Sequence, residues 1–192
     1  MRHRYFDLAF TPAVQTEQER HGSRAAYAGA AAAKAGPDAL TQRERGFIAA
    51  RDTFFLASVS ETGWPYVQHR GGPPGFVRVL DDGTIGWAEF VGNGQYVTAG
   101  NTRRDDRAAL VFLDFAHRRR LKLLGHLSSF DPAERPDLGL RLALDGYRAR
   151  IERLTVVTVE GFDWNCPQHI TPRLTAEEFA EAQAASLLPI ES

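Results

Sequence analysis

The stretch that decides the fold runs from Trp64 to Phe76 and reads W-P-Y-V-Q-H-R-G-G-P-P-G-F. Residues 66–70 alternate in character and follow a proline, which is well accommodated at the first residue of a strand, so they predict a β-strand. Residues 71–75 hold three glycines and two prolines, which suit neither a strand interior nor a helix interior. A strand carries an amide, an imidazole and a guanidinium into this stiff turn. Burying these polar groups costs free energy unless each finds a hydrogen-bonding partner.

Outward from this stretch, the sequence predicts more short strands in hairpin-like order. Asp81-Asp82-Gly83 predicts a hairpin, because Asp-Gly supplies the positive φ angles of a type I′ turn. The other β-rich segments are residues 53–60, 76–80, 84–90, 108–115, 121–130 and 154–162. Six or seven strands with few helices between them predict a mainly β, α+β protein with an antiparallel barrel or sandwich.

Helical signals lie mainly at the two ends of the chain. Thr11-Pro12 has the threonine cap and first-turn proline of a helix start, and Thr41 and Glu44 have capping-box spacing. An apolar stripe of Leu140, Leu144, Tyr147 and Ile151 predicts a helix over residues 135–151. Further helices are expected over residues 25–35, 38–50, 92–101 and 175–187. We expect residues 1–37 to form an N-terminal helical arm and residues 38–192 to form one domain.

Composition excludes several classes of partner. The 192 residues are 43% apolar and 24% charged, and the net charge of −1 gives no electrostatic reason to bind nucleic acid or an anionic membrane. The single cysteine, Cys166, cannot form an intrachain disulfide, and no apolar run approaches the ~20 residues that span a bilayer. We therefore expect a cytoplasmic protein.

Motifs for the commonest kinds of site are missing. There is no phosphate-binding G-x-x-x-x-G-K-[ST], no G-x-S-x-G, no H-x-x-x-H and no C-x-x-C. Cys166 and His169 are two candidate metal ligands, which is too few for a site, so no metal is expected. Cys166 itself is better explained as a small buried residue before Pro167 than as a nucleophile.

Polar residues instead gather in four groups beside glycines and strand ends. These groups are Gln68 to Arg70, Gly92 to Gln95 at an expected helix start, His117 to Lys122, and Trp164 to Arg173. Backbone N–H groups at a helix start favour an anion. Each group also has a plainer interpretation: an exposed strand face, a solvated basic turn, or a core tryptophan with a satisfied N–H.

Taken together, these stretches resemble the pyridoxamine 5′-phosphate oxidase-like, FMN-binding split-barrel superfamily, and within it a branch of uncharacterised bacterial flavoproteins. The specific matches are W-P-Y-V-Q-H-R-G-G-P-P-G-F at 64–76 and W-N-C-P-Q-H-I-T-P-R at 164–173. Supporting matches cover nearly the whole chain: residues 10–14, 22–24, 47–52, 92–93, 95–96, 100–101, 106–107 and 119–122.

The resemblance implies a six-stranded split β-barrel with flanking helices, so that residues 38–192 would be an FMN-binding split-barrel domain. It also implies a homodimer that binds FMN at its two-fold interface. The implied cofactor contacts are Val67, Gln68, His69 and Arg70 along the ring and ribityl phosphate, Gln95 and Arg120 from the same chain, and Trp164, Gln168, His169 and Arg173 from the partner chain. Arginine forks and backbone donors suit a phosphate, and a flat side chain such as Trp164 suits the flavin ring.

One departure from the branch concerns the expected phosphate ligands. The related sequences read G-N-R-Q-Y where this chain reads Gly92-Asn93-Gly94-Gln95-Tyr96, so an arginine is missing at Gly94. Losing one charge-assisted contact costs about 1.5–3 kcal/mol, or one to two decades in affinity. We expect FMN to bind more weakly, with Arg70, Arg120 or backbone N–H groups compensating.

The sequence thus predicts an FMN-dependent oxidoreductase of unknown substrate. His69 and His169 are the nearby candidates for proton transfer. The S-R-K and R-L-H motifs of the vitamin-forming oxidase are absent, which argues against pyridoxamine phosphate as substrate. Two alternatives stay open. One is a non-enzymatic protein that binds or senses flavin, haem or another planar ligand, or that has lost its cofactor; the other is a reductase that uses a deazaflavin.

Overall fold

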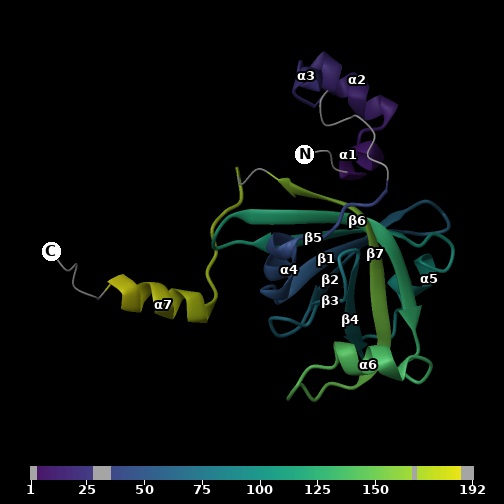
Figure 1. The fold of residues 1–192 in the computed structure, drawn as a ribbon, viewed down its shortest axis with the longest axis vertical. Helices are drawn as coiled ribbons and strands as arrows, with labels where there is room; N and C mark the ends of the chain where they lie inside the picture. The colour runs from purple at the N-terminus through teal and green to yellow at the C-terminus, as the bar shows by residue number, and fades with distance from the viewer. Residues whose placement is uncertain (1–3, 28–35, 166–167, 187–192) are drawn as a thin grey trace.

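Seven antiparallel strands form one strongly curved sheet in the computed structural model, which describes residues 4–27, 36–165 and 168–186 (Figure 1). The strand order is β2-β1-β5-β6-β7-β4-β3, and every neighbouring pair is antiparallel. The strands are β1 Thr53–Val59, β2 Pro65–Gly71, β3 Arg78–Val79, β4 Thr84–Phe90, β5 Arg107–Asp114, β6 Arg119–Phe130 and β7 Ile151–Asn165. The predicted antiparallel, mainly β fold with flanking helices is confirmed.

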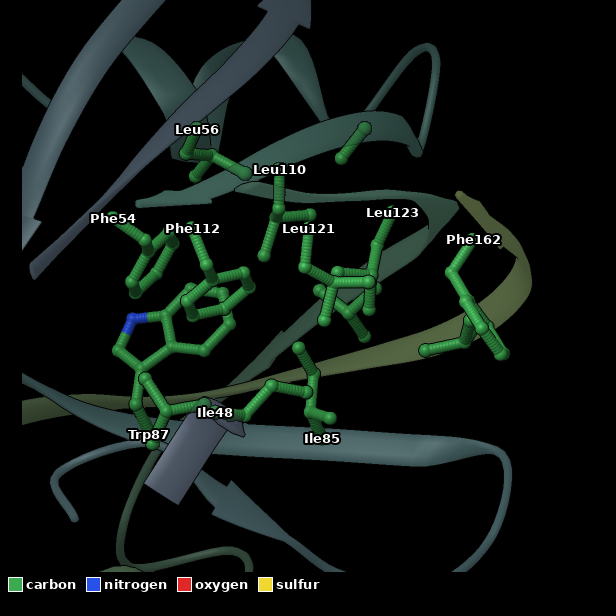
Figure 2. Close-up of a cluster of buried hydrophobic side chains, with 14 of the residues drawn as sticks. Ile48, Phe54, Leu56, Ile85, Trp87, Leu110, Phe112, Leu121, Leu123 and Phe162 are labelled. Carbon is green, nitrogen blue, oxygen red and sulfur yellow. The ribbon is translucent and has the colours of Figure 1, made fainter. Parts of the chain in front are cut away.

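The sheet does not close on itself, because β2 and β3 remain as its two edges. Six strands have seven or more residues, and β3 has two. This is the open, split arrangement that the resemblance implies. Alternate side chains of β1, β5 and β6 point into the concave side, where they meet those of β4 and β7 in one apolar core (Figure 2). The largest fully buried side chains there include Trp87, Phe54 and Phe112.

Helix α4 (Gln42–Ala49) packs against this core with Phe47 and Ile48 buried. The predicted capping box is confirmed: the Thr41 hydroxyl accepts the backbone N–H of Glu44, and the Glu44 side chain accepts the backbone N–H of Thr41. The helix is shorter than the expected 38–50, because the Asp38 carboxylate accepts backbone N–H groups from α1 (Arg4–Ala9) and β7. That role holds residue 38 outside the helix.

The expected helix over residues 135–151 is wrong. The helix α6 (Pro136–Leu142) is seven residues long and buries Leu138 and Leu142 instead of the predicted stripe. Leu140 is 82% exposed, and Ile151 begins β7. After Leu142 the chain leaves the helix: residues 143–150 form turns and irregular structure, in which the Leu144 carbonyl accepts the Tyr147 N–H and Gly146 has a φ of 73°. Pairing with Phe90 of β4 then makes Ile151 the first residue of β7.

The N-terminal arm holds α1, α2 (Pro12–Arg20) and α3 (Arg24–Tyr27), and lies above the β6–β7 side of the sheet (Figure 1). The predicted start of α2 is confirmed, because the Thr11 hydroxyl accepts the backbone N–H of Val14. Helix α1 approaches β7 at Gly161 so closely that a Cβ there would lie 2.4 Å from the Tyr5 nitrogen. Most of the expected alanine-rich helix, residues 28–35, lies outside the described residues.

Two further features differ from or extend the expectations. The β3–β4 hairpin is present, but Asp82 and Gly83 do not have positive φ angles, so its turn is not type I′; the Asp81 side chain closes it by accepting the Gly83 N–H. Helix α7 (Ala176–Ser186) lies within the expected 175–187, and Thr175 and Glu178 cap each other at its start. No helix in the described ranges is long and apolar enough to cross a membrane.

Candidate functional site

Strand β2 presents different chemistry on its two faces. Gln68 and Arg70 are partly buried and point toward β4 and α5 (Val97–Asn101), whereas Val67 and His69 point to the opposite, convex side. The alternation follows from the period of two in a strand. The four residues that the resemblance groups together are therefore divided between two surfaces.

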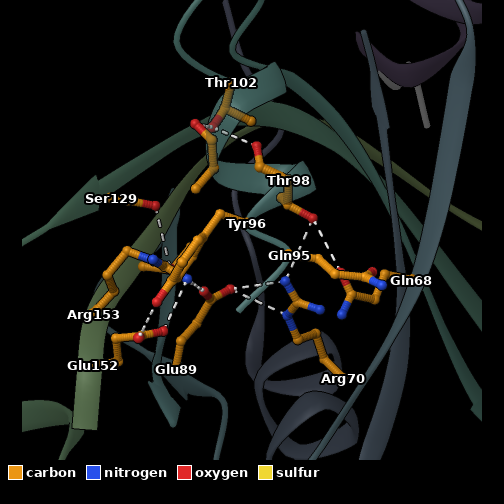
Figure 3. A network of polar contacts seen from close by, with 12 residues as sticks. Gln68, Arg70, Glu89, Gln95, Tyr96, Thr98, Thr102, Ser129, Glu152 and Arg153 are labelled. Carbon is orange, nitrogen blue, oxygen red and sulfur yellow. Dashed lines mark hydrogen bonds and ion pairs between the residues drawn. The ribbon is translucent and has the colours of Figure 1, made fainter. Parts of the chain in front are cut away.

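The concave-side residues of β2 line a pocket at the open edge of the sheet (Figure 3). Its volume is ≈ 220 Å³, and it lies between the ends of β2, β4 and β7 and the loop that leads to α5. Its lining is Gln68, Arg70, Glu89, Phe90, Gly92, Asn93, Gly94, Gln95, Tyr96, Val97, Thr98, Ala99, Glu152 and Arg153. We call it the β2 pocket. Gln68, Arg70 and Gln95, three of the predicted cofactor contacts, meet here.

A carboxylate between two arginines forms the charged wall of the β2 pocket. The Arg70 Nε donates to Glu89 Oε1 at 3.1 Å, and Arg70 Nη2 forms an ion pair with the same oxygen, also at 3.1 Å. Arg153 donates to Glu89 Oε2 from Nη2 at 3.0 Å and from Nε at 3.3 Å. The register explains the second pair, because Glu89 of β4 lies directly opposite Arg153 of β7.

Tyr96 closes the other side of the pocket in an unusual conformation. Its φ of 52° is left-handed, which is uncommon for a residue that is not glycine. The phenol donates to Glu152 Oε1 at 2.7 Å, and the Arg153 guanidinium lies 4.9 Å from its ring centroid. The hydrogen bond to the Glu152 carboxylate raises the pKa of Tyr96. The side chain is thereby fixed across the pocket edge.

The loop before α5 differs from the expected helix over residues 92–101. The helix begins only at Val97 and has five residues, so the predicted helix-start N–H groups at Gly92 to Gln95 are wrong. The Gln95 N–H is instead used by the Asn93 side chain. Gly94 has a φ of +71°, and nothing lies within 4 Å of the position of a Cβ there. The place of the missing arginine is therefore open space beside the pocket.

The convex face of β2 continues into an apolar surface. His69 lies opposite Phe55 of β1 and hydrogen-bonds the Thr53 hydroxyl, while Val67 is 62% exposed. Arg120 also lies on this convex side, opposite Leu113 of β5. Its Nε is buried and has no hydrogen-bond partner among the described residues. His69 and Arg120 are therefore remote from the β2 pocket lining and belong to the other face.

The Trp164 side chain is partly buried and packs against the core of its own chain. Its ring packs edge-on against Phe47 at 4.7 Å, the Arg43 guanidinium lies 4.2 Å above it, and its Nε1 donates to Glu44 Oε1 at 2.6 Å. Burial alone would raise the pKa of Glu44, but hydrogen bonds from Thr41 and Trp164 outweigh it and lower that pKa. These contacts fit the plainer interpretation of a tryptophan packed against the core with a satisfied N–H, while a contact of Trp164 with a flavin in a partner chain stays a prediction.

The remaining predicted contacts follow β7 at the end of the sheet away from the β2 pocket. Gln168 and His169 are exposed, and His169 has a φ of 63°. The Arg173 guanidinium lies 5.2 Å from the Phe115 ring and lines a second pocket with Arg51 and Asp114. Helix α7 projects from the body of the molecule (Figure 1). Cys166 lies outside the described residues.

Sequence reasoning missed five of the pocket residues that the argument uses: Glu89, Tyr96, Thr98, Glu152 and Arg153. Opposite charges in the segments 84–90 and 151–162 were visible, but pairing them requires the β4–β7 register, which includes a bulge at Glu89/Phe90. Tyr96 could not be recognised in this role, because no sequence pattern predicts its left-handed backbone conformation. Among the described residues, no three His, Cys, Asp or Glu side chains are grouped as metal ligands.

The donors of the β2 pocket fit the two polar parts of FMN unequally. The Gln68 and Gln95 amides and the Thr98 hydroxyl suit the hydroxyl groups of a ribityl chain. Arginines suit a phosphate, but both forks that face the pocket are already bound to Glu89. The residues therefore fit the ribityl part, whereas a phosphate dianion must compete with Glu89.

Comparisons with known proteins agree with this fold. The family model described as pyridoxamine 5′-phosphate oxidase matches residues 40–163. No curated protein matches the chain. That family match covers all seven strands but for the end of β7, and it includes the whole lining of the β2 pocket.

Several solved structures are similar to this chain at low sequence identity. HupZ of Group A Streptococcus is 17% identical, covering 70% of this chain and 99% of its own, with a TM-score of 0.49. An FMN-binding protein of Syntrophomonas wolfei is 15% identical, covering 64% and 83%, with a TM-score of 0.49. An F420 reductase is 18% identical, covering 62% and 94%, with a TM-score of 0.43.

Proposed function

Since this chain belongs to the pyridoxamine 5′-phosphate oxidase family, we propose that it is a cytoplasmic, homodimeric FMN-binding protein and a flavin-dependent oxidoreductase. One observation carries the proposal: three residues assigned to the cofactor from the sequence, Gln68, Arg70 and Gln95, meet in one pocket at the open edge of the sheet. The single cysteine of the sequence cannot form an intrachain disulfide, so an oxidising compartment is not implied.

In this proposal the chain's own residues bind and orient the cofactor. Gln68, Gln95 and Thr98 hold the ribityl chain, and Arg70 lies nearest to the phosphate end. A bound flavin supplies hydride and electron transfer. His169 and Arg173 reach it from the partner chain, whereas His69 and Arg120 lie on the convex face and do not line the β2 pocket.

The homodimer is supported by the convex face of the sheet. Val67, Phe55 and Val59 are apolar side chains that are each more than a third exposed on neighbouring strands. Apolar patches of this kind mark interaction sites. We propose that a second copy packs on this face and that its residues 168–173 approach the cofactor.

The visible absorption spectrum of the purified protein tests the cofactor. We expect flavin bands to be retained after incubation with FMN and desalting, with one FMN released per chain on denaturation. Absence of retained flavin, together with no thermal stabilisation by excess FMN, contradicts the proposal.

Sedimentation of the protein tests the dimer. We expect a dimer for the wild type and a monomer for Val67→Glu, because a carboxylate in the centre of an apolar interface is costly to desolvate. Val91→Glu is the control, since Val91 is an exposed valine outside the convex face of β2. A wild-type protein that sediments as a monomer at micromolar concentration rules out this part of the proposal.

One observation favours the non-enzymatic alternative: neither His69 nor His169 lines the β2 pocket. A protein that binds flavin without turnover needs no proton donor there. Reduction of the bound FMN by NADH or NADPH separates the two functions. Rapid bleaching of the flavin band supports the oxidoreductase, and an unchanged band with both donors supports the binding protein.

A further inference from the structure

Glu89 occupies the positions that an anionic ligand would take in the β2 pocket. Its side chain is only 10% exposed, and its two oxygens accept three hydrogen bonds, from Arg70 Nε and from Arg153 Nε and Nη2, while Arg70 Nη2 forms an ion pair with Oε1. Each arginine faces Glu89 with the Nε–Nη2 edge of its guanidinium group, which is the edge that a phosphate also prefers. The pocket thus contains its own acidic ligand (Figure 3).

The charge of the pocket is balanced without a ligand. Arg70 and Arg153 are its two cationic lining residues, and Glu89 and Glu152 are its two acidic ones. Glu152 adds a second contact to Arg153, at 3.4 Å. A phosphate dianion in this space would meet two carboxylates and no uncommitted guanidinium fork of the pocket lining.

The loop before α5, on the far side of the pocket, offers no positively charged side chain in place of the two bound arginines. Gly94 carries no side chain, and the Gln95 N–H is bound to Asn93. Neutral donors are well represented, since the Gln68 amide and the Thr98 hydroxyl meet at the pocket wall. The balance of groups therefore favours a hydroxyl-bearing, uncharged ligand.

We propose that Glu89 is the specificity-determining residue of this pocket, and that it competes with phosphate for Arg70 and Arg153 so that the protein hardly distinguishes FMN from riboflavin. This inference rests on the proposed flavin binding. It assigns affinity to the ring and the ribityl chain, with little contribution from the phosphate. The opposite role is that Glu89 holds Arg70 in position to bind the phosphate, and the two roles predict opposite effects of removing its charge.

Titration of wild-type protein with FMN and with riboflavin, followed by flavin fluorescence, measures the phosphate contribution directly. We expect the two dissociation constants to differ by ten-fold or less. In Glu89→Gln the arginine forks are released, and we expect the preference for FMN to rise at least ten-fold. Glu61→Gln is the matched control, because it removes the same charge from an exposed pair with Arg104 outside the pocket, and its preference should equal that of the wild type.

A wild-type preference for FMN above ten-fold overturns the inference, and so does a preference that falls in Glu89→Gln. The wild-type ratio decides the matter even if the variant does not fold. If neither flavin binds, the proposed function fails, and inorganic phosphate still tests Glu89. Ten millimolar phosphate should raise the melting temperature of Glu89→Gln and leave the wild type unchanged, whereas equal shifts in both proteins contradict the role of Glu89.

Discussion

Two carboxylates in this molecule are each held between arginines, yet their surroundings differ. Asp114 at the end of β5 is 1% exposed and accepts from Arg119 at 2.7 Å, with Arg51 at 3.6 Å. It also accepts the backbone N–H of His117 at 2.9 Å, which fixes the turn between β5 and β6. Glu89 in the β2 pocket binds only other side chains.

The comparison separates a structural carboxylate from a candidate functional one. A carboxylate that closes a backbone turn cannot change partners without opening the turn. One that binds only guanidinium groups beside an open pocket can exchange them for water or a ligand. We therefore expect the loss of Asp114 to affect folding and the loss of Glu89 to affect binding.

The largest effect is expected for Asp114→Asn. It leaves Arg51 and Arg119 without their counter-ion near a buried turn, and we expect the free energy of unfolding to fall by about 3 kcal/mol at pH 7. Urea unfolding measures it. Asp137→Asn, which removes an exposed pair with Arg135, is the control and should change stability by less than about 0.5 kcal/mol. A loss below about 1 kcal/mol for Asp114→Asn would remove the contrast between the two carboxylates.

The pH dependence of stability should report the same residue. Burial alone would raise the pKa of Asp114, but hydrogen bonds from the His117 backbone and from Arg119 outweigh it and lower the pKa to about 2, from 3.8. A lowered pKa means that the stabilisation, about 2 kcal/mol, is complete above pH 4 and lost as the pH falls toward 2. Unfolding curves of wild type and Asp114→Asn should therefore converge between pH 4 and pH 2. Curves that stay parallel over this range would assign the stabilisation to other groups.

Gly94→Arg should strengthen FMN binding by ten-fold or more. The Cβ position at Gly94 is open, and an arginine there adds a fork that Glu89 does not already bind. Because φ is +71°, any side chain at this position is strained, so Gly94→Ala is the matched control for that strain. If FMN binds Gly94→Arg no more tightly than the wild type, the position has no role in phosphate binding.

The smallest effect is expected for the stability of Glu89→Gln. Arg70 and Arg153 lie beside an open pocket where water can reach them, so we expect unfolding to become easier by no more than about 1 kcal/mol. Thermal and urea unfolding of Glu89→Gln, compared with those of Asp114→Asn, measure this loss of stability. Equal losses of unfolding free energy in the two variants would mean that Glu89 stabilises the fold as much as Asp114 does.

Much of the fold was predictable because it follows local rules. The strand at 64–70, the turn residues after it and the capping box at Thr41 and Glu44 were all predicted from the sequence and are present. The helix over 135–151 was wrong because the chain turns after Leu142, with a positive φ at Gly146, so that the apolar stripe is not continued. The type I′ turn at Asp82-Gly83 was wrong because the Asp81 side chain closes the hairpin in another way.

The candidate site was predictable only in part. Residues 67–70 were recognised as functional, but the alternation of β2 sends Val67 and His69 away from Gln68 and Arg70. Glu89 and Arg153 are 64 residues apart and become partners only through the β4–β7 register. Contacts of Trp164, Gln168, His169 and Arg173 with a flavin in a partner chain stay a prediction.

A crystal structure of the protein soaked or grown with FMN tests the central claim most directly. The account predicts a dimer joined through the convex face of the sheet. It also predicts the ribityl chain in the β2 pocket, against Gln68, Gln95 and Thr98. A flavin bound elsewhere on the molecule, with the β2 pocket empty and the Arg70–Glu89–Arg153 contacts unchanged, would contradict it.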